Sequence, residues 1–122
     1  MIGTDARSRA RVRSLERVSN ELVARGQLWL WNRTEAFPAK ESSPSIDAAD
    51  RIFRYVDEIL RVLEAEIGDN PFLAGDTPTV ADFTAFPMFQ TARERFDLPF
   101  GEDHPRLESW YKRFRSRPSA DF

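Results

Sequence analysis

The stretch that decides the fold is Phe72-Leu73-Ala74-Gly75-Asp76-Thr77-Pro78-Thr79-Val80-Ala81-Asp82-Phe83, a turn that leads into a helix. Thr79 and Asp82 have the spacing of a capping box, in which each side chain accepts a hydrogen bond from the other residue's backbone N–H. Pro78 and Phe83 flank the box at the positions of a hydrophobic staple. We assign these residues a structural rather than a catalytic role, because the first N–H groups of a helix lack partners within it. The spacing predicts a helix that starts after Thr79.

The residues after this start continue as a strongly apolar helix face. Phe83, Phe86, Phe89 and Ala92 recur at three-residue intervals, which places them on one side of a helix. Pro87 lies inside the pattern, and a proline cannot donate to the helix ladder. A kink is therefore expected near Pro87.

Two longer helices are predicted upstream, over about 6–33 and 46–67, with a proline-containing loop over 34–45 between them. Thr4 or Asp5 is expected to cap the first helix, and Ser43 followed by Pro44 the second. Apolar and small side chains form the stripe of the first helix: Val12, Leu15, Ser19, Leu22, Gly26 and Trp29. The second stripe is longer: Ile46, Ala49, Phe53, Val56, Leu60, Leu63 and Ile67.

A last helix is predicted from about 103–105 to Pro118. Its apolar side chains share one face: Leu107, Trp110, Tyr111 and Phe114. No segment alternates apolar and polar residues with a period of two, which is the pattern of a half-buried strand. The fold class expected from the sequence is all-α.

Composition excludes several classes of function. The chain has 122 residues, the length of one domain, and contains no Cys, so cysteine nucleophiles and Cys zinc sites are absent. A net charge of −2 does not favour nucleic acid or an anionic membrane as partner. The sequence contains no apolar run of about 18 residues, the length that a membrane-spanning helix needs. A cytoplasmic location is the simplest expectation.

The capping motif and its surroundings resemble the C-terminal helical domain of glutathione S-transferases. The match runs through the turn and cap at 72–82, through His104-Pro105-x-Leu107-x-x-Trp110, and through Arg117-Pro118-Ser119. Residues 1–5, leading into Arg9-Ala10, are similar to the family's interdomain linker. Spanning 1–122 in the expected order, the resemblance implies a bundle of four to five helices.

The resemblance also implies a partner domain that these residues do not contain. In the family, a thioredoxin-like N-terminal domain binds glutathione and carries the catalytic residue. Residues 1–6 are accordingly expected to be the remnant of a linker in a longer protein. The parent protein would transfer glutathione, as co-substrate, to hydrophobic electrophiles in detoxification, and this chain alone would be inactive and bind no cofactor. The alternative is a standalone, non-catalytic interaction or dimerisation module with the same fold.

Family analogy and helix geometry together suggest one set of binding residues. Arg11, Ser14 and Val18 lie at three- and four-residue spacing, on one side of the first helix and off its core stripe. In the family, the N-terminal half of this helix borders the cleft that holds the electrophile. We expect these three residues to form part of the cleft wall, although a solvated arginine-rich face is the simpler interpretation of Arg7, Arg9, Arg11 and Arg13.

Catalytic and metal-binding residues are not expected in this chain. His104 is the single histidine, and it has no identifiable nucleophile to activate. The acids of the second helix alternate with Arg51, Arg54 and Arg61, which predicts a solvated face. A homodimer is expected, because loss of the partner domain would expose apolar area on the first helix and on the Phe-rich helix.

Overall fold

A computed structural model describes residues 5–34 and 46–117, and these residues form helices joined by turns. The elements are α1 (Ala6–Arg33), α2 (Ile46–Ile67), α3 (Val80–Gln90), the π-helical turn η1 (Thr91–Arg95) and α4 (Pro105–Arg115). Within the described ranges no strand forms, and the one β-bridge joins Phe72 to Gly75 across a tight turn. The prediction of an all-α fold with four to five helices is confirmed.

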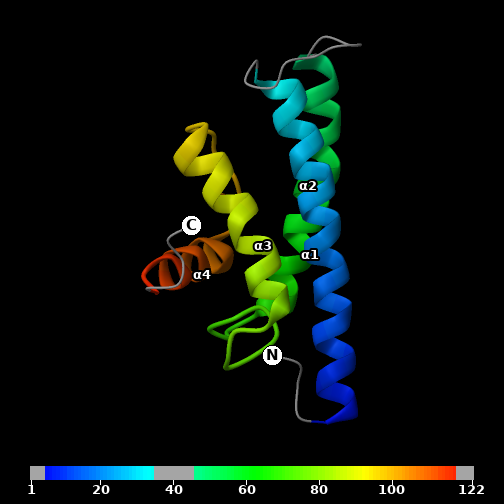
Figure 1. The fold of residues 1–122 in the computed structure, drawn as a ribbon, viewed down its shortest axis with the longest axis vertical. Coiled ribbons are helices and arrows are strands. Elements are labelled where there is room, and N and C mark those ends of the chain that lie inside the picture. Colours follow the sequence, from blue (N-terminus) through cyan, green and yellow to red (C-terminus); the bar gives the residue numbers. More distant parts are fainter. Residues whose placement is uncertain (1–4, 35–45, 118–122) are drawn as a thin grey trace.

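The helices are arranged around α1, the longest of them. In Figure 1, α1 and α2 run side by side in opposite directions, and α3 lies on the other side of α1, to its left in this view. α1 packs against both α2 and α3, whereas α4 packs against α2 and α3. The first helix, α1, and the last helix, α4, are therefore connected through α2 and α3, which contact both.

The sequence of α1 explains where the helix begins and which of its sides is buried. Its N-cap is Asp5, whose carboxylate accepts a 2.7 Å hydrogen bond from the N–H of Ser8. The predicted stripe is confirmed, because all six of its members are buried: Val12, Leu15, Ser19, Leu22, Gly26 and Trp29. Gly26 lets α3 approach closely, since a Cβ there would lie 2.8 Å from Met88 Sδ.

α2 follows its predicted stripe except at Ile46 and Phe53, of which Phe53 is half-buried and packs against the edge of the core. Ala49, Val56, Leu60, Leu63 and Ile67 are buried. Ile46, which the periodicity placed in the core, is instead 53% exposed at the N-terminal end of α2. The helix ends at Gly68, whose positive φ of 52° is a conformation that glycine adopts without steric cost. The loop over 35–45, with the proposed cap at Ser43 and Pro44, lies outside the described residues.

The core is built largely from aromatic rings of α3 and α4. Phe86 and Phe89 are fully buried, as are Trp110, Phe114 and Phe100. Phe89 packs edge-on against Phe100, with ring centroids 4.9 Å apart. α3 therefore has no exposed large apolar side chain, and the expectation that the Phe-rich helix presents an uncovered apolar face is wrong.

α2 also fixes the start of α4. The carboxylate of Glu64 accepts hydrogen bonds from the N–H groups of Arg106, at 3.0 Å, and Leu107, at 2.9 Å. A carboxylate at this position satisfies two N–H groups and interacts favourably with the positive end of the helix dipole. His104 is the N-cap residue of α4, and its Nε2 lies 3.2 Å from Asp57 Oδ1 on α2.

Candidate functional site

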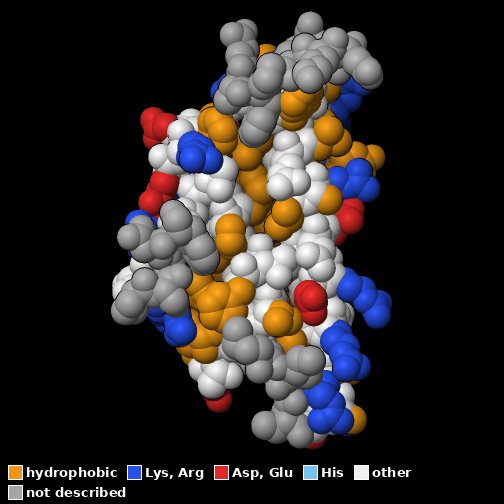
Figure 2. All heavy atoms as spheres, in the orientation of Figure 1, with side chains coloured by type: hydrophobic (Ala, Val, Ile, Leu, Met, Phe, Trp, Pro, Cys, Tyr) orange, Lys and Arg blue, Asp and Glu red, His pale blue; other side chains and the backbone are white. Residues whose placement is uncertain are grey.

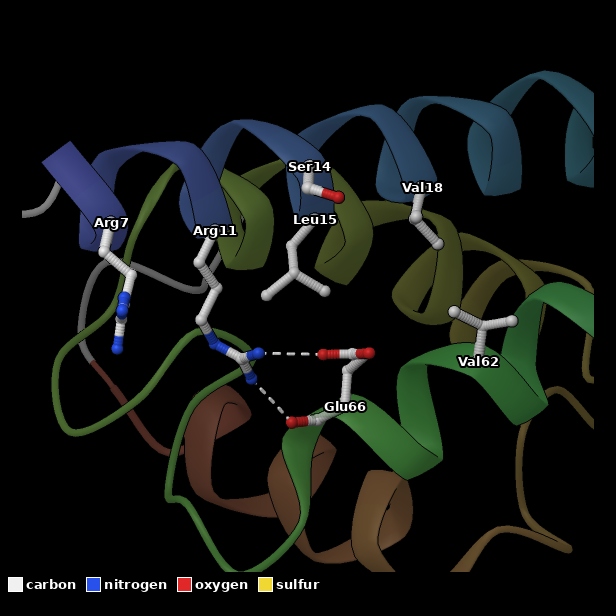
Figure 3. Close-up of a pocket in the computed structure, with 7 residues that line it drawn as sticks. All are labelled: Arg7, Arg11, Ser14, Leu15, Val18, Val62 and Glu66. Atoms are coloured by element: carbon white, nitrogen blue, oxygen red, sulfur yellow. Dashed lines mark hydrogen bonds and ion pairs between the residues drawn. The ribbon is translucent and has the colours of Figure 1, made fainter.

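A groove lies between the N-terminal half of α1 and the C-terminal end of α2. Its volume is about 430 Å³, within the range of small-molecule sites. Figure 3 shows the residues that line it: Arg7, Arg11, Ser14, Leu15, Val18, Val62 and Glu66. The three side chains selected from the sequence, Arg11, Ser14 and Val18, therefore share one groove.

One end of the groove is closed by an ion pair. Arg11 Nη1 donates to the carboxylate of Glu66 at 2.8 Å, and its Nη2 donates to the backbone carbonyl of Glu66 at 2.7 Å. That carbonyl belongs to the last turn of α2, whose C=O groups have no partners within the helix. Arg11 thus closes the end of α2 as well as lining the groove, and only part of its guanidinium remains available to a ligand.

The groove changes character along its length. Arg7 stands beside Arg11 at the polar end, and it forms no ion pair within 5–34 and 46–117. At the other end, Val18 of α1 and Val62 of α2 point toward each other, with Leu15 between them and the polar end. Such a surface can hold an apolar molecule against the valines while a polar substituent contacts the arginines.

The apolar end continues into a neighbouring depression. This second hollow, of about 360 Å³, shares Val18 and Val62 and adds Ile59 of α2. The contribution of α2 to this surface was not predicted from the sequence. The available signal was the position of Val62, an apolar residue that lies off the core stripe of its helix.

The capping residues lie elsewhere, at the start of α3. Thr79 and Asp82 form the capping box, in which the N–H of Thr79 donates to Asp82 Oδ2 at 2.9 Å. Asp82 is fully buried, and its Oδ1 also accepts from the N–H of Leu73, at 2.9 Å, and from Trp110 Nε1, at 2.8 Å. Pro78 and Phe83 are half-buried beside the box. These contacts agree with a structural role, and none of these residues reaches the α1–α2 groove.

The second polar cluster joins η1 to α4. Glu94 accepts hydrogen bonds from the hydroxyl of Tyr111 and from Arg115 Nε, the latter at 2.9 Å. Burial, followed by the hydrogen bond to Glu94, raises the pKa of Tyr111. The hydrogen bonds from Tyr111 and then Arg115 lower the pKa of Glu94. Arg93 lies 4.3 Å from the ring centroid of Tyr111 and pairs with Glu108, so the cluster braces the packing of α4.

Neither a metal site nor a nucleophile emerges from these clusters. In the part of the chain that the structure describes, no three His, Asp or Glu side chains converge as metal ligands. His104 contacts Asp57, and Asp57 in turn pairs with Arg61, so the histidine links α4 to α2. None of the described helices is long and apolar enough to cross a lipid bilayer.

Comparison with known proteins agrees with this architecture. The family described as glutathione S-transferase, C-terminal domain, matches residues 46–113. The chain belongs to this family. A crystal structure of a glutathione S-transferase from Rhodospirillum rubrum F11 superposes with a TM-score of 0.76 at 30% identity, over 98% of this chain and 54% of that one. The glutathione S-transferase domain therefore contains α2, α3, η1 and α4, with α1 packed against them.

Two curated relatives give matches of similar identity. Glutathione S-transferase F13 from Arabidopsis thaliana is 28% identical over 82 residues, which cover 67% of this chain and 37% of the relative. The disulfide-bond oxidoreductase YfcG from Escherichia coli K12 is 29% identical over 74 residues, or 60% of this chain and 33% of the relative. The chain thus spans about a third of either relative's length, and their names describe different activities.

Proposed function

We propose that this domain supplies the electrophile-binding side of a glutathione transferase. The observation that carries the proposal is the α1–α2 groove, in which Arg11, Ser14 and Val18 face Val62 and Glu66. Its valine end offers apolar contact to a hydrophobic electrophile, and Ser14 and the arginines offer hydrogen bonds to polar substituents such as a nitro or carbonyl oxygen. Family membership supports glutathione as the co-substrate.

Catalysis in this proposal is divided between two domains. Conjugation requires the glutathione thiol to lose its proton, and the resulting thiolate attacks the electrophilic carbon while the leaving group departs. A thioredoxin-like domain, which residues 1–122 do not contain, would bind glutathione and stabilise its thiolate. The helical domain would hold the electrophile, since restricting its position lowers the entropic part of the barrier. On this account the 122-residue chain is inactive alone and acts in the cytoplasm with that partner.

Subunit contact is the second role that we propose for the domain. Four large apolar side chains stand out from the described surface, all on α1 and α2: Leu28, Ile46, Tyr55 and Val62, each at least 46% exposed. Exposed apolar residues concentrated on one pair of helices favour association. This observation supports a homodimer, and it also supports the alternative of a non-catalytic dimerisation module.

The binding role is tested by titrating an unreactive nitroaromatic, 1,3-dinitrobenzene, into the ¹⁵N-labelled chain. The proposal predicts saturable shifts of the backbone amides of Ser14, Val18 and Val62. Val62→Asp should abolish these shifts by placing a charge in the groove. Leu28→Asp is the matched control, since Leu28 is 47% exposed and Val62 46%, but Leu28 lies outside the groove. Equal loss in both variants, or shifts elsewhere, would count against the groove.

The subunit role is tested by sedimentation equilibrium of the same chain. A dimer that Tyr55→Asp dissociates, and that Thr77→Asp in the exposed turn before α3 leaves intact, would support it. A monomer at every concentration up to the millimolar range would contradict both the proposed homodimer and the alternative of a dimerisation module. The titration with 1,3-dinitrobenzene would still test the α1–α2 groove in that case.

A further inference from the structure

The N-terminal half of α1 carries a line of arginines on its outward face. Arg9, Arg13 and Arg17 recur at four-residue intervals, so they lie along one side of the helix, about 6 Å apart along its axis. All three are exposed, on the side away from the buried residues that pack against α2 and α3. Figure 2 shows Lys and Arg side chains along this edge of the molecule, at the lower right of the view. We call these three residues the arginine stripe.

The arginine stripe has no counter-charge within residues 5–34 and 46–117. None of its three side chains forms an ion pair or a hydrogen bond with another residue in these ranges. Two other arginines of α1 differ in this respect. Arg11 lies 2.8 Å from the carboxylate of Glu66. Arg25 lies 2.8 Å from the carboxylate of Glu21. The three positive charges of the stripe are therefore available to carboxylates from another molecule.

The positive charge is confined to one part of an acidic chain. Residues 6–20 contain five arginines and one acid, Glu16, whereas the whole chain has a net charge of −2. A long polyanion such as a nucleic acid would extend from this region onto the acidic remainder, whereas a short acidic segment would contact the basic region alone. Ala6 and Ala10 are exposed beside the stripe and are too small to anchor it in a lipid bilayer. The charge pattern therefore favours a short acidic protein segment as the partner.

We propose that the arginine stripe binds an acidic helix of another protein. Glutamates at every fourth position of a helix lie about 6 Å apart along its axis, which is the spacing of the stripe. A guanidinium can bind a carboxylate through two parallel N–H groups, so each arginine can hold one glutamate. Because the pairs are exposed, each contributes little, and binding depends on all three together. The inference is independent of the electrophile site, because Arg9 and Arg13 do not border the α1–α2 groove, and Arg17 borders only the smaller hollow beside it.

The test titrates an alanine-based helical peptide, with glutamate at every fourth position, into the ¹⁵N-labelled chain. We expect saturable shifts of the backbone amides of Arg9, Arg13 and Arg17. Binding should be about fivefold weaker at high salt than at low salt, because exposed charges are screened. The same peptide with glutamine in place of glutamate should not bind. A peptide with its glutamates placed consecutively should bind about threefold more weakly, since its carboxylates point to different sides of the helix.

Variants of the chain test the arginines themselves. Arg13→Gln should weaken peptide binding about threefold, as the loss of one exposed ion pair implies. Replacement of all three arginines of the stripe by glutamine should abolish binding. Arg54→Gln is the matched control, because Arg54 is an exposed arginine of α2 that has no partner among the described residues and lies outside the stripe. Circular dichroism should show normal folding in each variant, since the replaced side chains are exposed and unpaired.

Several outcomes would overturn the proposal. Absence of saturable binding, or equal loss in Arg13→Gln and Arg54→Gln, would show that the stripe is only a solvated face. Equal affinity for the spaced and the consecutive peptides would show a general charge effect without the proposed spacing. Tighter binding of a uridine oligonucleotide or of phosphatidylglycerol vesicles would assign the stripe to a nucleic acid or a lipid surface. Concentration-dependent shifts of the same amides without peptide would assign it to a second copy of the chain.

Discussion

The indole Nε1 of Trp110 donates a 2.8 Å hydrogen bond to the buried carboxylate of Asp82, joining α4 to the start of α3. The same carboxylate accepts from the N–H groups of Leu73 and Thr79 and from the Thr79 hydroxyl. One side chain thus connects the turn at 72–75, the capping box and the last helix. Because all of its partners are donors, no neutral side chain of similar size can replace it.

Replacement of Asp82 should therefore be more damaging than loss of an ordinary cap. An exposed N-cap contributes about 1 kcal/mol. We expect Asp82→Ala to lower the free energy of unfolding by about 3–5 kcal/mol, because several buried donors lose their partner at once. Asp82→Asn should be nearly as harmful, since its amide NH₂ would face another donor. Urea unfolding followed by circular dichroism measures both, and a loss below about 1 kcal/mol in Asp82→Ala would contradict this role.

Glu64 should stabilise α4 from its position on α2. Glu64→Ala removes the acceptor for the N–H groups of Arg106 and Leu107, and we expect a loss of about 1–2 kcal/mol in unfolding free energy. Asp50→Ala is the control, because Asp50 is an exposed acid of α2 that makes no contact with α4 among the described residues. The same urea measurement applies. Equal effects of the two variants would mean that the contact between Glu64 and α4 contributes nothing.

Stability should depend on pH through Glu94 and Tyr111. The pKa of Glu94 is lowered in the folded chain, so its contribution is present above the unfolded pKa of about 4.3 and is lost as the pH falls further. The pKa of Tyr111 is raised, so its contribution is present below the unfolded pKa of about 10 and is lost above it. Thermal melts at several pH values should show that Glu94→Gln reduces the loss of stability on the acid side. The change in unfolding free energy should be less than about 1 kcal/mol, because Glu94 is 42% exposed. Tyr111→Phe should reduce the loss of stability on the alkaline side. If both variants kept the pH dependence of the unmodified chain, Glu94 and Tyr111 would not be its source.

Arg11 and Arg7 should differ in their contribution to stability, although both line the α1–α2 groove. Arg11→Met removes the bonds to the Glu66 carboxylate and to the last turn of α2, and we expect a loss of about 0.5–1 kcal/mol because Arg11 is 38% exposed. Arg7→Met should leave the unfolding free energy unchanged, since Arg7 has no partner among the described residues. Chemical denaturation of the two variants gives the comparison. Identical midpoints would show that Arg11 does not brace α2.

The sequence predicted the features that depend on local spacing. The bounds of α1 and α2 and the capping box of Thr79 and Asp82 all follow from residues within a few turns of each other. The burial of α3 could not be predicted in the same way. Periodicity showed that its phenylalanines share a face, but whether α1 and α4 cover that face depends on how the helices pack.

The candidate site was predicted only on the side of α1. Helix geometry placed Arg11, Ser14 and Val18 together, and the structure places them in one groove. The contacts of Arg11 with Glu66 join residues 55 positions apart, and the register between α1 and α2 that creates them cannot be obtained from either helix alone. The π-turn that follows Pro87 was likewise unpredicted, because the proline indicates only that the helix ladder is interrupted.

The measurement that tests the central claim most directly is a calorimetric titration of glutathione into the folded chain. If this domain contributes the electrophile side of a transferase and a thioredoxin-like partner binds glutathione, the titration should show no saturable heat. The chain should still bind 1,3-dinitrobenzene in the α1–α2 groove. Saturable glutathione binding that Arg11→Met weakens would show that the arginine end of the groove holds glutathione itself, and it would contradict the proposed division between the two domains.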